Sequence, residues 1–450
     1  MAEVKRKNKF NILTHGCQMN EHDSEILAGF LKGMGYQEID DCHKADVFII
    51  NTCAIREKAE EKVYSRLGAL KKLKEERPHM IIGVCGCIPQ QEGIARKIKS
   101  RYPHVDLVFG THNLHKFPEL LQKAMEKRKT FIDVWPQREG IIEGLPVGRK
   151  DGIKAWVPVT YGCNNFCAYC VVPYVRGREH SREMNNIVAE VENLAAEGYK
   201  EVTLLGQNVN SYGKDLSNEV SFARLLKRLD KIEDLERIRY MTSHPRDFTG
   251  ELVEVIWQSS RVCEHFHLPL QSGSNKILKK MNRGYTREDY LELVEYIREL
   301  IPQASITTDF IVGFPGEEEK DFADTLDMVE KVRFDSAFTF MYSPRKGTAA
   351  AEMPHRLNQE VKKKRLSRLI QLQTRISKEI NEKLRGRSLE VLVEGISKQN
   401  PSMLTGRTRT NKTVNFKGDK DLLGNLVQVL IKEPKTWSLD GELTREPVSF

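Results

Sequence analysis

The feature that most constrains the fold is an alternation of short apolar runs with longer amphipathic segments, which occupies most of this 450-residue chain. Apolar runs of about four to eight residues that are rich in Ile, Val and Phe are typical of buried strands, and the segments between them have helical periodicity. Strands that alternate with helices favour parallel sheets covered by helices on both faces. The sequence therefore predicts an α/β protein.

Breaks in this alternation divide the chain into parts. Residues 8–130 are expected to form a doubly wound α/β domain, and residues 131–152, rich in Gly, are expected to form a linker. Residues 153–384 contain six further βα units, fewer than the eight of a closed barrel, so we expect a partial, open (β/α)6 barrel that ends in a helix. The strand candidates of this barrel are Trp156–Tyr161, Glu201–Leu205, Arg237–Thr242, Phe266–Leu270, Ile306–Val312 and Ser336–Tyr342.

The pattern changes near the carboxyl end. Residues 387–450 contain strands of alternating apolar and polar residues, such as SLEVLVEG and NLVQVLIKE. Several short strands with this alternation predict a small β-barrel. The preceding segment, Asn358–Leu384, has the periodicity of an amphipathic helix, and Gly386 is a plausible stop for it.

Composition limits the compartment and the chemistry of the cysteines. No apolar run approaches the ~20 residues that a membrane span needs, and the start MAEVKRKNKFNIL lacks the apolar stretch of a secretory signal. We therefore expect a cytoplasmic protein with no membrane partner. The nine cysteines are then unlikely disulfide partners, so each is either a packing residue or a metal or redox ligand.

Three of the cysteines, Cys163, Cys167 and Cys170, lie within eight residues in YGCNNFCAYC, just after the first predicted barrel strand. The carboxyl ends of barrel strands are where catalytic residues lie. A structural zinc site wants four ligands, and a 4Fe–4S cluster normally takes four cysteines. Three thiolates on such a cluster would leave one iron open to a substrate or cofactor. The alternative is that all three cysteines only pack.

A second set of cysteines is spread over the first domain. Cys17, Cys53 and Cys87 each follow a predicted strand, and ligands of open parallel sheets bind outside the carboxyl ends of the strands. We therefore expect these side chains to converge on one site. Cys85 lies two residues before Cys87 and is expected mainly to pack, as are Cys42 and Cys263.

The loop containing Cys163, Cys167 and Cys170, with Tyr169 before its last cysteine, resembles the signature of radical S-adenosylmethionine enzymes. In that family the three cysteines bind a 4Fe–4S cluster whose open iron binds S-adenosylmethionine. The stretches THGCQMNEHDSE, INTCAIREKAEEK and GVCGCIPQ are similar to a narrower group, the methylthiotransferases. That resemblance implies a second 4Fe–4S cluster on Cys17, Cys53 and Cys87, and a TRAM domain at the carboxyl end.

Within this group, CAYCVVPYVRGREHSR, RYMTSHPRD, HLPLQSGSNKILKKMNRGYTREDY and TTDFIVGFPGE most resemble the enzymes that act on tRNA. The resemblance implies methylthiolation of carbon 2 of N6-(dimethylallyl)adenosine at position 37, next to the anticodon, with S-adenosylmethionine as radical source and methyl donor. Relatives with the same chemistry act on threonylcarbamoyl-adenosine in tRNA or on an aspartate of a ribosomal protein. A different class of function also fits the cysteines and the charge, namely a non-catalytic, metal-containing RNA-binding module.

The resemblance also implies cofactor contacts and partners. S-adenosylmethionine is expected to lie across the open ends of the barrel strands, and no catalytic residue is expected beyond the cluster ligands. An electron donor of the flavodoxin or ferredoxin kind and a sulfur donor are implied. The candidate S-adenosylmethionine contacts follow the second and fifth barrel strands and are Gly206, Gln207, Asn208, Gly313, Phe314, Pro315 and Gly316.

Positive charge is concentrated in one segment. Of a net charge of +8, the stretch from Arg356 to Gly386 carries +7. A basic stripe of this kind indicates a polyanion partner, here the tRNA anticodon stem-loop, although a solvated helix face is the alternative. The predicted phosphate contacts are Lys362, Lys363, Lys364, Arg365 and Arg368 on the helix, continued by Arg407, Arg409 and Lys412 on the small barrel.

Overall fold

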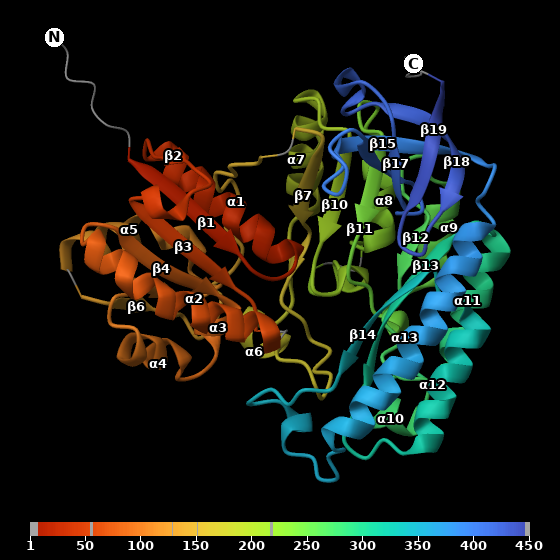
Figure 1. The fold of residues 1–450 in the computed structure, drawn as a ribbon, viewed down its shortest axis with the longest axis horizontal. Coiled ribbons are helices and arrows are strands. Elements are labelled where there is room, and N and C mark those ends of the chain that lie inside the picture. The colour runs from red at the N-terminus through yellow and green to blue at the C-terminus, as the bar shows by residue number, and fades with distance from the viewer. Residues whose placement is uncertain (1–7, 55–56, 128, 151, 217–218, 446–450) are drawn as a thin grey trace.

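Three parts make up the chain in the computed structural model, which describes residues 8–54, 57–127, 129–150, 152–216 and 219–445. An amino-terminal α/β domain lies beside an open parallel barrel, and a small closed β-barrel packs on one end of the open barrel (Figure 1). The predicted fold class and its three-part order are confirmed. Among the described residues, no helix combines the length and apolar character that crossing a membrane requires.

The amino-terminal domain is built on a six-stranded parallel sheet in the order β2-β1-β3-β4-β5-β6. Every residue of β3 and β4 is buried, which explains why these strands are continuous apolar runs. The strands are β1 (Lys9–Thr14), β2 (Gln37–Glu38), β3 (Val47–Thr52), β4 (Ile81–Gly86), β5 (Leu107–Phe109) and β6 (Phe131–Asp133). The helices are α1 (Gln18–Gly33), α2 (Glu57–Glu76), α3 (Cys87–Gln90), α4 (Ile94–Arg101) and α5 (Phe117–Lys127).

One boundary differs from the sequence-based expectation. Strand β6 falls at the start of the predicted linker and pairs with β5, so the first sheet extends to Asp133. Its Phe131-Ile132-Asp133 run is only three residues long, too short for a period to be recognised in the sequence.

The central domain contains six parallel strands that follow one another in chain order. They form two three-stranded sheets, β7-β10-β11 and β12-β13-β14, joined by a parallel bridge between Ile238 and Val262. This arrangement is the predicted open six-unit barrel. The strands are β7 (Lys154–Pro158), β10 (Glu201–Leu205), β11 (Arg237–Tyr240), β12 (His265–His267), β13 (Ser305–Val312) and β14 (Ser336–Met341), with a small side pair of β8 (Thr160–Tyr161) and β9 (His180–Ser181).

Helices cover the outside of the open barrel, and the largest apolar core lies between them and the strands. Several begin with the side-chain caps that helix starts favour: Thr249 caps α9, Thr286 caps α11 and Asn358 caps α13. The helices are α6 (Val172–Arg176), α7 (Met184–Ala196), α8 (Phe222–Leu229), α9 (Gly250–Gln258), α10 (Asn275–Lys280), α11 (Arg287–Leu300), α12 (Glu319–Val332) and α13 (Gln359–Glu382).

The carboxyl-terminal strands close into a barrel in the order β15-β16-β17-β19-β18 around its own apolar core. Closure leaves no free sheet edge. The strands are β15 (Ser388–Ile396), β16 (Leu404–Thr408), β17 (Thr413–Phe416), β18 (Leu426–Pro434) and β19 (Leu439–Arg445). Residues 446–450 of the predicted last domain lie outside the described residues.

Two buried arginines of β11 fasten the small barrel to the central domain. Arg237 donates to the carbonyl oxygen of Arg407 (2.6 Å) and to the Glu390 carboxylate (2.8 Å). Arg239 donates to the carbonyl oxygens of Arg409 (3.0 Å) and Thr408 (2.8 Å), and its Nε binds the Glu201 carboxylate at 2.7 Å. The interface therefore depends on two buried guanidinium groups, which bind main-chain oxygens of the small barrel.

Replacing Arg239 by Met should destabilise the protein by about 3–5 kcal/mol, because the Glu201 carboxylate, 2% exposed, would remain buried without its cation. Thermal melts should show a lower Tm, and trypsin should release the small barrel sooner than in the wild type. The matched control is Arg385→Gln, since Arg385 is exposed at the end of α13 and pairs with an exposed carboxylate. Equal melting and cleavage of the two variants would contradict the role of Arg239.

Candidate cluster sites and nucleic-acid interface

The loop of Cys163, Cys167 and Cys170 lies at the open end of the central barrel, between β8 and α6. Cys163 donates its N–H to the Gly177 carbonyl oxygen (3.1 Å), and Cys170 donates to that of Cys167 (2.9 Å). Gly162 has φ +73°, and a Cβ there would lie 1.9 Å from the Arg178 carbonyl oxygen, so only glycine fits. These backbone hydrogen bonds and the turn at Gly162 fold the segment so that all three cysteines lie in one loop.

A buried cation lies against this loop. Arg283, 4% exposed, donates to the Sγ of Cys167 (3.3 Å) and to the Pro269 carbonyl oxygen (2.7 Å). Burial raises the pKa of Cys163 to about 11 and that of Cys170 to about 12, so without a metal these thiols are protonated. A metal centre would deprotonate them, and the Arg283 guanidinium would then balance part of the thiolate charge. The loop therefore fits a three-cysteine iron–sulfur site.

The amino-terminal triad follows three neighbouring strands of the first sheet. Cys17 follows β1, Cys53 follows β3 and Cys87 follows β4, all at the same edge. A Cβ on Gly16 would lie 3.0 Å from the Cys53 Cβ, so the residue before Cys17 touches Cys53. Burial, opposed by the charge of Arg176 and helped by the neighbouring Cys53 and Cys17, raises the pKa of Cys87 to about 11. The structure thus brings the three predicted cysteines together.

Arg176 connects the two cysteine sites. It lies in α6, six residues after Cys170, and its guanidinium, 2% exposed, reaches into the amino-terminal domain. There it pairs with Asp23 (2.7 Å) and donates to the Oδ1 of Asn20 (3.0 Å), and its charge acts to lower the pKa of Cys87. Sequence reasoning did not assign Arg176, although the RGREHSR stretch that contains it was singled out.

The remaining cysteines are buried among other side chains. Cys85 is fully buried in the apolar core that also contains Ile49 and Leu107. Cys42 and Cys263 are 8% and 1% exposed, and Cys42 accepts a hydrogen bond from Arg66 (2.8 Å). These environments agree with the packing roles expected for the three residues.

The candidate S-adenosylmethionine contacts occupy two turns at the open end of the barrel. Gly206, Gln207 and Asn208 follow β10, where Thr242 donates to the Gly206 carbonyl oxygen (2.6 Å) and Asn208 donates to Asp247 (2.7 Å). The Oδ1 of Asn208 is buried without a partner among the described residues. This orphaned acceptor is the feature of the turn that best fits a bound cofactor.

The second turn, Gly313–Gly316 after β13, is more enclosed. Phe314 is fully buried beneath the cysteine loop, packed with Ala168 and Tyr342. A Cβ on Gly313 (φ +74°) would lie 2.5 Å from the Cγ of Lys362, and one on Gly316 would lie 2.2 Å from the Nζ of Lys280. Pro315 is buried as well. The side chain of Phe314 therefore supports the loop from within the core.

The basic helix does not form the predicted stripe. Lys362 is 4% exposed and donates to the Tyr342 carbonyl oxygen (3.0 Å), and Arg365 is 5% exposed and pairs with Glu317 (2.6 Å). Both residues lie on the inner face of α13, so their assignment as phosphate contacts is wrong. Lys363, Lys364 and Arg368 lie on its exposed face, where Arg368 pairs with Glu319.

The predicted basic residues of the small barrel are also engaged elsewhere. Arg409 binds the Glu264 carboxylate (2.6 Å), Lys412 binds Asp335 (2.6 Å), and Arg407 lies 3.6 Å from Glu394. The partners of Arg409 and Lys412 belong to the central domain. A count of charges along the sequence does not show which cations pair with carboxylates in the folded protein. Arg409 and Lys412 form such pairs across the domain interface.

A large cleft lies between the amino-terminal domain and the cysteine loop of the barrel, with a volume of about 1400 Å³. Its walls include the aromatic rings of Phe166 and Tyr174, which meet edge to face at 6.1 Å, and the Arg178 guanidinium lies 4.3 Å over the Phe166 ring. Carboxylates are fewer there than cations. The cations that line the cleft are Arg96, Arg138, Arg178, Arg345 and Lys346.

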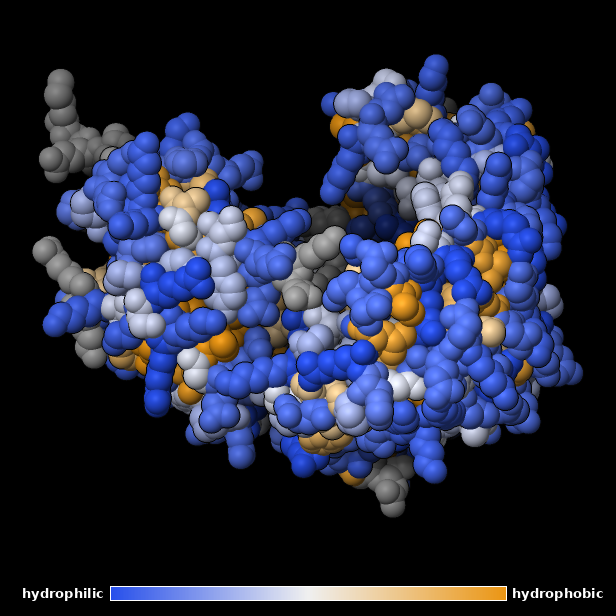
Figure 2. Space-filling view, turned by 60° about the horizontal axis from the view of Figure 1, so that its bottom comes forward, coloured by the Kyte–Doolittle hydropathy of each residue, from blue (hydrophilic) through white to orange (hydrophobic). Residues whose placement is uncertain are grey.

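This cleft has the composition of a nucleic-acid site. Aromatic rings provide surfaces on which unpaired bases stack, and arginine and lysine side chains contact phosphates. The face of the molecule in Figure 2 is mostly hydrophilic. The cleft was not predicted, because its residues come from sequence segments far apart.

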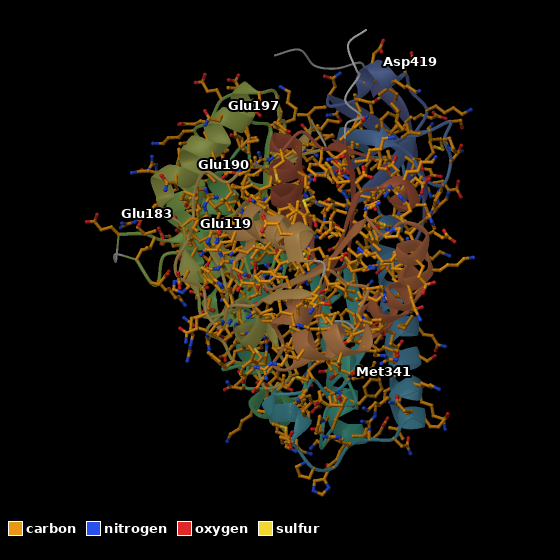
Figure 3. All side chains as sticks on the ribbon, turned by 90° about the vertical axis from the view of Figure 1, so that its left-hand side faces the viewer. Glu119, Glu183, Glu190, Glu197, Met341 and Asp419 are labelled. Carbon is orange, nitrogen blue, oxygen red and sulfur yellow. The ribbon has the colours of Figure 1, made fainter. Side chains whose placement is uncertain are left out.

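An acidic group near Cys163 has an unusual environment. Glu179, 7% exposed, accepts a hydrogen bond from the Ser211 hydroxyl (2.6 Å). The next helix, α7, is marked in Figure 3 by Glu183, Glu190 and Glu197. Burial raises the pKa of Glu179 to about 7, with Asp215 adding to the shift, so this carboxyl group is partly protonated near neutral pH.

An open six-strand barrel with a three-cysteine loop at its mouth, joined to a second cysteine site, defines a radical S-adenosylmethionine protein. Family models agree: the Radical SAM superfamily matches residues 157–329, the uncharacterized protein family UPF0004 matches 9–110, and the TRAM domain matches 382–444. A structure of the radical S-adenosylmethionine methyltransferase TsrM from Kitasatospora setae covers 85% of this chain and 77% of its own at 14% identity and a TM-score of 0.54, which shows the fold.

Curated relatives show which group within the radical S-adenosylmethionine proteins this chain belongs to. The tRNA-2-methylthio-N(6)-dimethylallyladenosine synthase of Acetivibrio thermocellus is 57% identical over 98% of this chain and 93% of its own length. The protein of the same name from Pelotomaculum thermopropionicum is 56% identical over 97% and 98%. The chain belongs to the family of these synthases, as the resemblance in its motifs predicted.

The raised pKa of Glu179 predicts a pH-dependent stability. Because the folded pKa lies above the ordinary value of 4.5, the contribution of this group is complete at acid pH below that value and is lost as the pH rises through about 7. The Tm of the wild type should therefore fall relative to that of Glu179→Gln between about pH 4.5 and 7, the two pKa values, and the difference should stay constant at higher pH. The control is Glu197→Gln at the exposed end of α7, whose curve of Tm against pH should run parallel to that of the wild type. If the Glu179→Gln curve also runs parallel to the wild type, the raised pKa of Glu179 is contradicted.

Proposed function

We propose that this protein methylthiolates carbon 2 of N6-(dimethylallyl)adenosine at position 37 of tRNA, with S-adenosylmethionine as radical source and methyl donor. The observation that carries the proposal is the pair of three-cysteine sites, joined through Arg176, on a chain that shares more than half of its residues with curated tRNA-2-methylthio-N(6)-dimethylallyladenosine synthases. The reaction would take place in the cytoplasm, where mature tRNA is found.

The chemistry explains why such sites are needed. Carbon 2 of adenine carries an unactivated hydrogen, which acid–base catalysis does not remove readily. When bound, 4Fe–4S clusters on the two triads would supply electron transfer for the reductive cleavage of S-adenosylmethionine and a position for an incoming sulfur. The protein would supply ligation, orientation and exclusion of water. Cys163, Cys167 and Cys170 would hold one cluster, Arg283 would balance part of its charge, and Phe314 would close the loop on the side of the core.

The other triad, Cys17, Cys53 and Cys87, would hold the second cluster, with Arg176 as its buried cation. The turn of Gly206, Gln207 and Asn208 is the better candidate for S-adenosylmethionine, since Asn208 has an orphaned acceptor there, while Gly313, Pro315 and Gly316 would contribute backbone. An external one-electron donor of the flavodoxin or ferredoxin kind and a sulfur donor complete the set of partners.

The RNA would enter through the cleft between the amino-terminal domain and the cysteine loop. Phe166 lies within that loop, so a base stacked on the ring of Phe166 or Tyr174 would be next to the radical site. Arg178 and Lys346 are exposed cations on the same wall and suit the phosphates of an anticodon loop. The exposed Lys363, Lys364 and Arg368 remain candidates for contacts farther along the stem.

Removing one cysteine triad at a time should separate the cleavage of S-adenosylmethionine from the methylthiolation of RNA. A Cys17→Ala, Cys53→Ala, Cys87→Ala protein should keep about half of its iron and still form 5′-deoxyadenosine from S-adenosylmethionine, but should make no methylthiolated RNA. The Cys163→Ala, Cys167→Ala, Cys170→Ala protein should lose 5′-deoxyadenosine formation and keep the other half of the iron. Iron, 5′-deoxyadenosine and modified adenosine are measured together after reduction by dithionite.

A matched control is Cys85→Ala, which removes a neighbouring buried thiol outside both triads and should leave the iron content unchanged. Methylthiolated tRNA formed over several turnovers by the amino-terminal triple variant would contradict the role of that site. Mass spectrometry of tRNA from cells lacking the gene identifies the nucleoside: accumulation of unmethylthiolated N6-(dimethylallyl)adenosine supports the proposal, and loss of a modified threonylcarbamoyl-adenosine instead would overturn it.

Substitutions in the cleft should weaken RNA binding more than substitutions on the helix. Tyr174→Ala should cost about 1–3 kcal/mol if a base stacks on the ring. Arg178→Gln with Lys346→Gln should lower affinity and make the dependence of log K on log salt shallower by about 0.7 for each lost phosphate contact to single-stranded RNA. Fluorescence anisotropy with an anticodon stem-loop measures both effects.

The comparison variant is Lys363→Gln with Lys364→Gln, which removes the same charge from the exposed face of α13. A smaller loss of affinity is expected for it than for the cleft variant. A greater loss of affinity in the helix variant would place the main RNA contact on the exposed face of α13. An unchanged affinity and salt slope would indicate that this face is only solvated.

A further inference from the structure

A second, smaller cavity lies beside the amino-terminal cysteine site, between that domain, the segment around Trp135–Leu145 and Tyr161 of the barrel. Its volume is about 150 Å³, enough for a ligand of a few atoms. The apolar part of its lining includes Ile26, Leu114 and Trp135, and the polar part includes Asp23, His112 and Arg138. Apolar walls with a few polar groups are typical of binding sites for small molecules.

His112 is the unexplained group in this cavity. It follows β5, the neighbour of β4 in the sheet, and thus continues the row of strand ends that carries Cys17, Cys53 and Cys87. Its side chain is 2% exposed, yet neither ring nitrogen has a hydrogen-bond partner among the described residues. Because buried polar groups are nearly always bonded, this imidazole lacks a ligand.

The surroundings of His112 carry positive charge. Asp23 is bound by Arg176, whereas Arg138 forms no ion pair within the described part of the chain. The Arg138 guanidinium donates to the Thr111 carbonyl oxygen (3.2 Å) and lies 4.4 Å over the Tyr161 ring, and its Nε has no partner there. Burial and the charges of Arg138 and Arg176 lower the pKa of His112 to about 4. Glu139 also lines the cavity, but its side chain is exposed.

The cavity also lies between the two cysteine sites. A Cβ on Gly177 would be 3.3 Å from the Cε1 of His112, and the Gly177 carbonyl oxygen accepts the Cys163 N–H. On the other side, Asp23 of the cavity wall binds Arg176, whose charge acts on Cys87. A ligand held at His112 is therefore separated from Cys163 by Gly177 and from Cys87 by Asp23 and Arg176.

We propose that this cavity binds hydrosulfide, HS⁻, between His112 and Arg138, and stores it beside the amino-terminal cysteine site. The anion is small, polarizable and weakly hydrated, which suits the apolar walls, and it would accept hydrogen bonds from an imidazole N–H and from the Arg138 Nε–H. The role assigned to the anion rests on the proposed function, which needs a sulfur donor, whereas the binding itself does not.

Crystals of the cluster-loaded protein soaked in sodium hydroselenide test the site directly. We expect an anomalous selenium peak between His112 and Arg138 in the wild type and none in His112→Phe, which keeps the ring shape but removes both nitrogens. A bromide soak is run in parallel. Ordered water only, or a bromide peak with no selenium, would overturn the assignment to hydrosulfide.

Kinetics give a second measure. In multiple-turnover methylthiolation, the sodium hydrosulfide concentration that gives half the maximal rate should rise about tenfold in His112→Phe, as expected when one hydrogen bond to an anion is lost. In His112→Gln, which retains a hydrogen-bond donor, the half-saturating concentration should return part of the way to the wild-type value. Such a partial recovery would show that the effect of His112→Phe comes from lost binding and not from misfolding. Arg138→Gln should raise the same constant, with RNA affinity measured beside it because Arg138 also lines the RNA cleft.

The matched control is Arg101→Gln, which removes one exposed positive charge from the same domain and should leave the hydrosulfide constant unchanged. An unchanged constant in His112→Phe would overturn the inference. A wild-type protein that binds selenium in the cavity but forms no methylthiolated RNA at any sulfide concentration would instead overturn the proposed function and support the anion site.

Discussion

The ion pair between Arg176 and Asp23 is the interaction on which the arrangement of the two cysteine sites depends. A guanidinium that is 2% exposed must keep its carboxylate, because a buried charge without a partner costs several kcal/mol. Arg176 belongs to the barrel and Asp23 to the first domain, so the domains cannot turn apart without exposing or orphaning both groups. The charge of the same guanidinium acts on the pKa of Cys87, so the pair links the barrel to the amino-terminal cysteine site.

What could be predicted from the sequence follows from local rules. The strands are continuous apolar runs, and in parallel sheets the strand ends share one edge, so the convergence of Cys17, Cys53 and Cys87 required no knowledge of side-chain contacts. Likewise, His265 and His267 stand two residues apart in strand β12 and so lie on one face of it, and a ring nitrogen of each bonds to the Thr307 hydroxyl. Arg176, His112 and Arg138 were missed because their roles arise only where separate domains meet.

The basic segment illustrates the opposite error. Lys362 and Arg365 were assigned to RNA because of the charge around them, yet a helix packed on a barrel buries one of its faces whatever residues lie there. Long cationic side chains can lie along an apolar surface and reach a carbonyl or carboxylate, as Lys362 does over Gly313 and Arg365 does at Glu317. The aromatic and cationic cleft, formed from residues 89–96, 132–138, 166–180 and 344–347 together with Glu60, has no corresponding signal in the linear sequence.

The way β11 holds the small barrel has a consequence for how these proteins diversify. Arg237 and Arg239 bind the main-chain oxygens of Arg407, Thr408 and Arg409, and every amino acid provides such an oxygen. The end of β16 and the residue after it can therefore change their side chains over generations while the joint persists, provided that the backbone path is kept. A carboxyl-terminal module attached in this manner is free to vary its outer surface independently of the catalytic barrel.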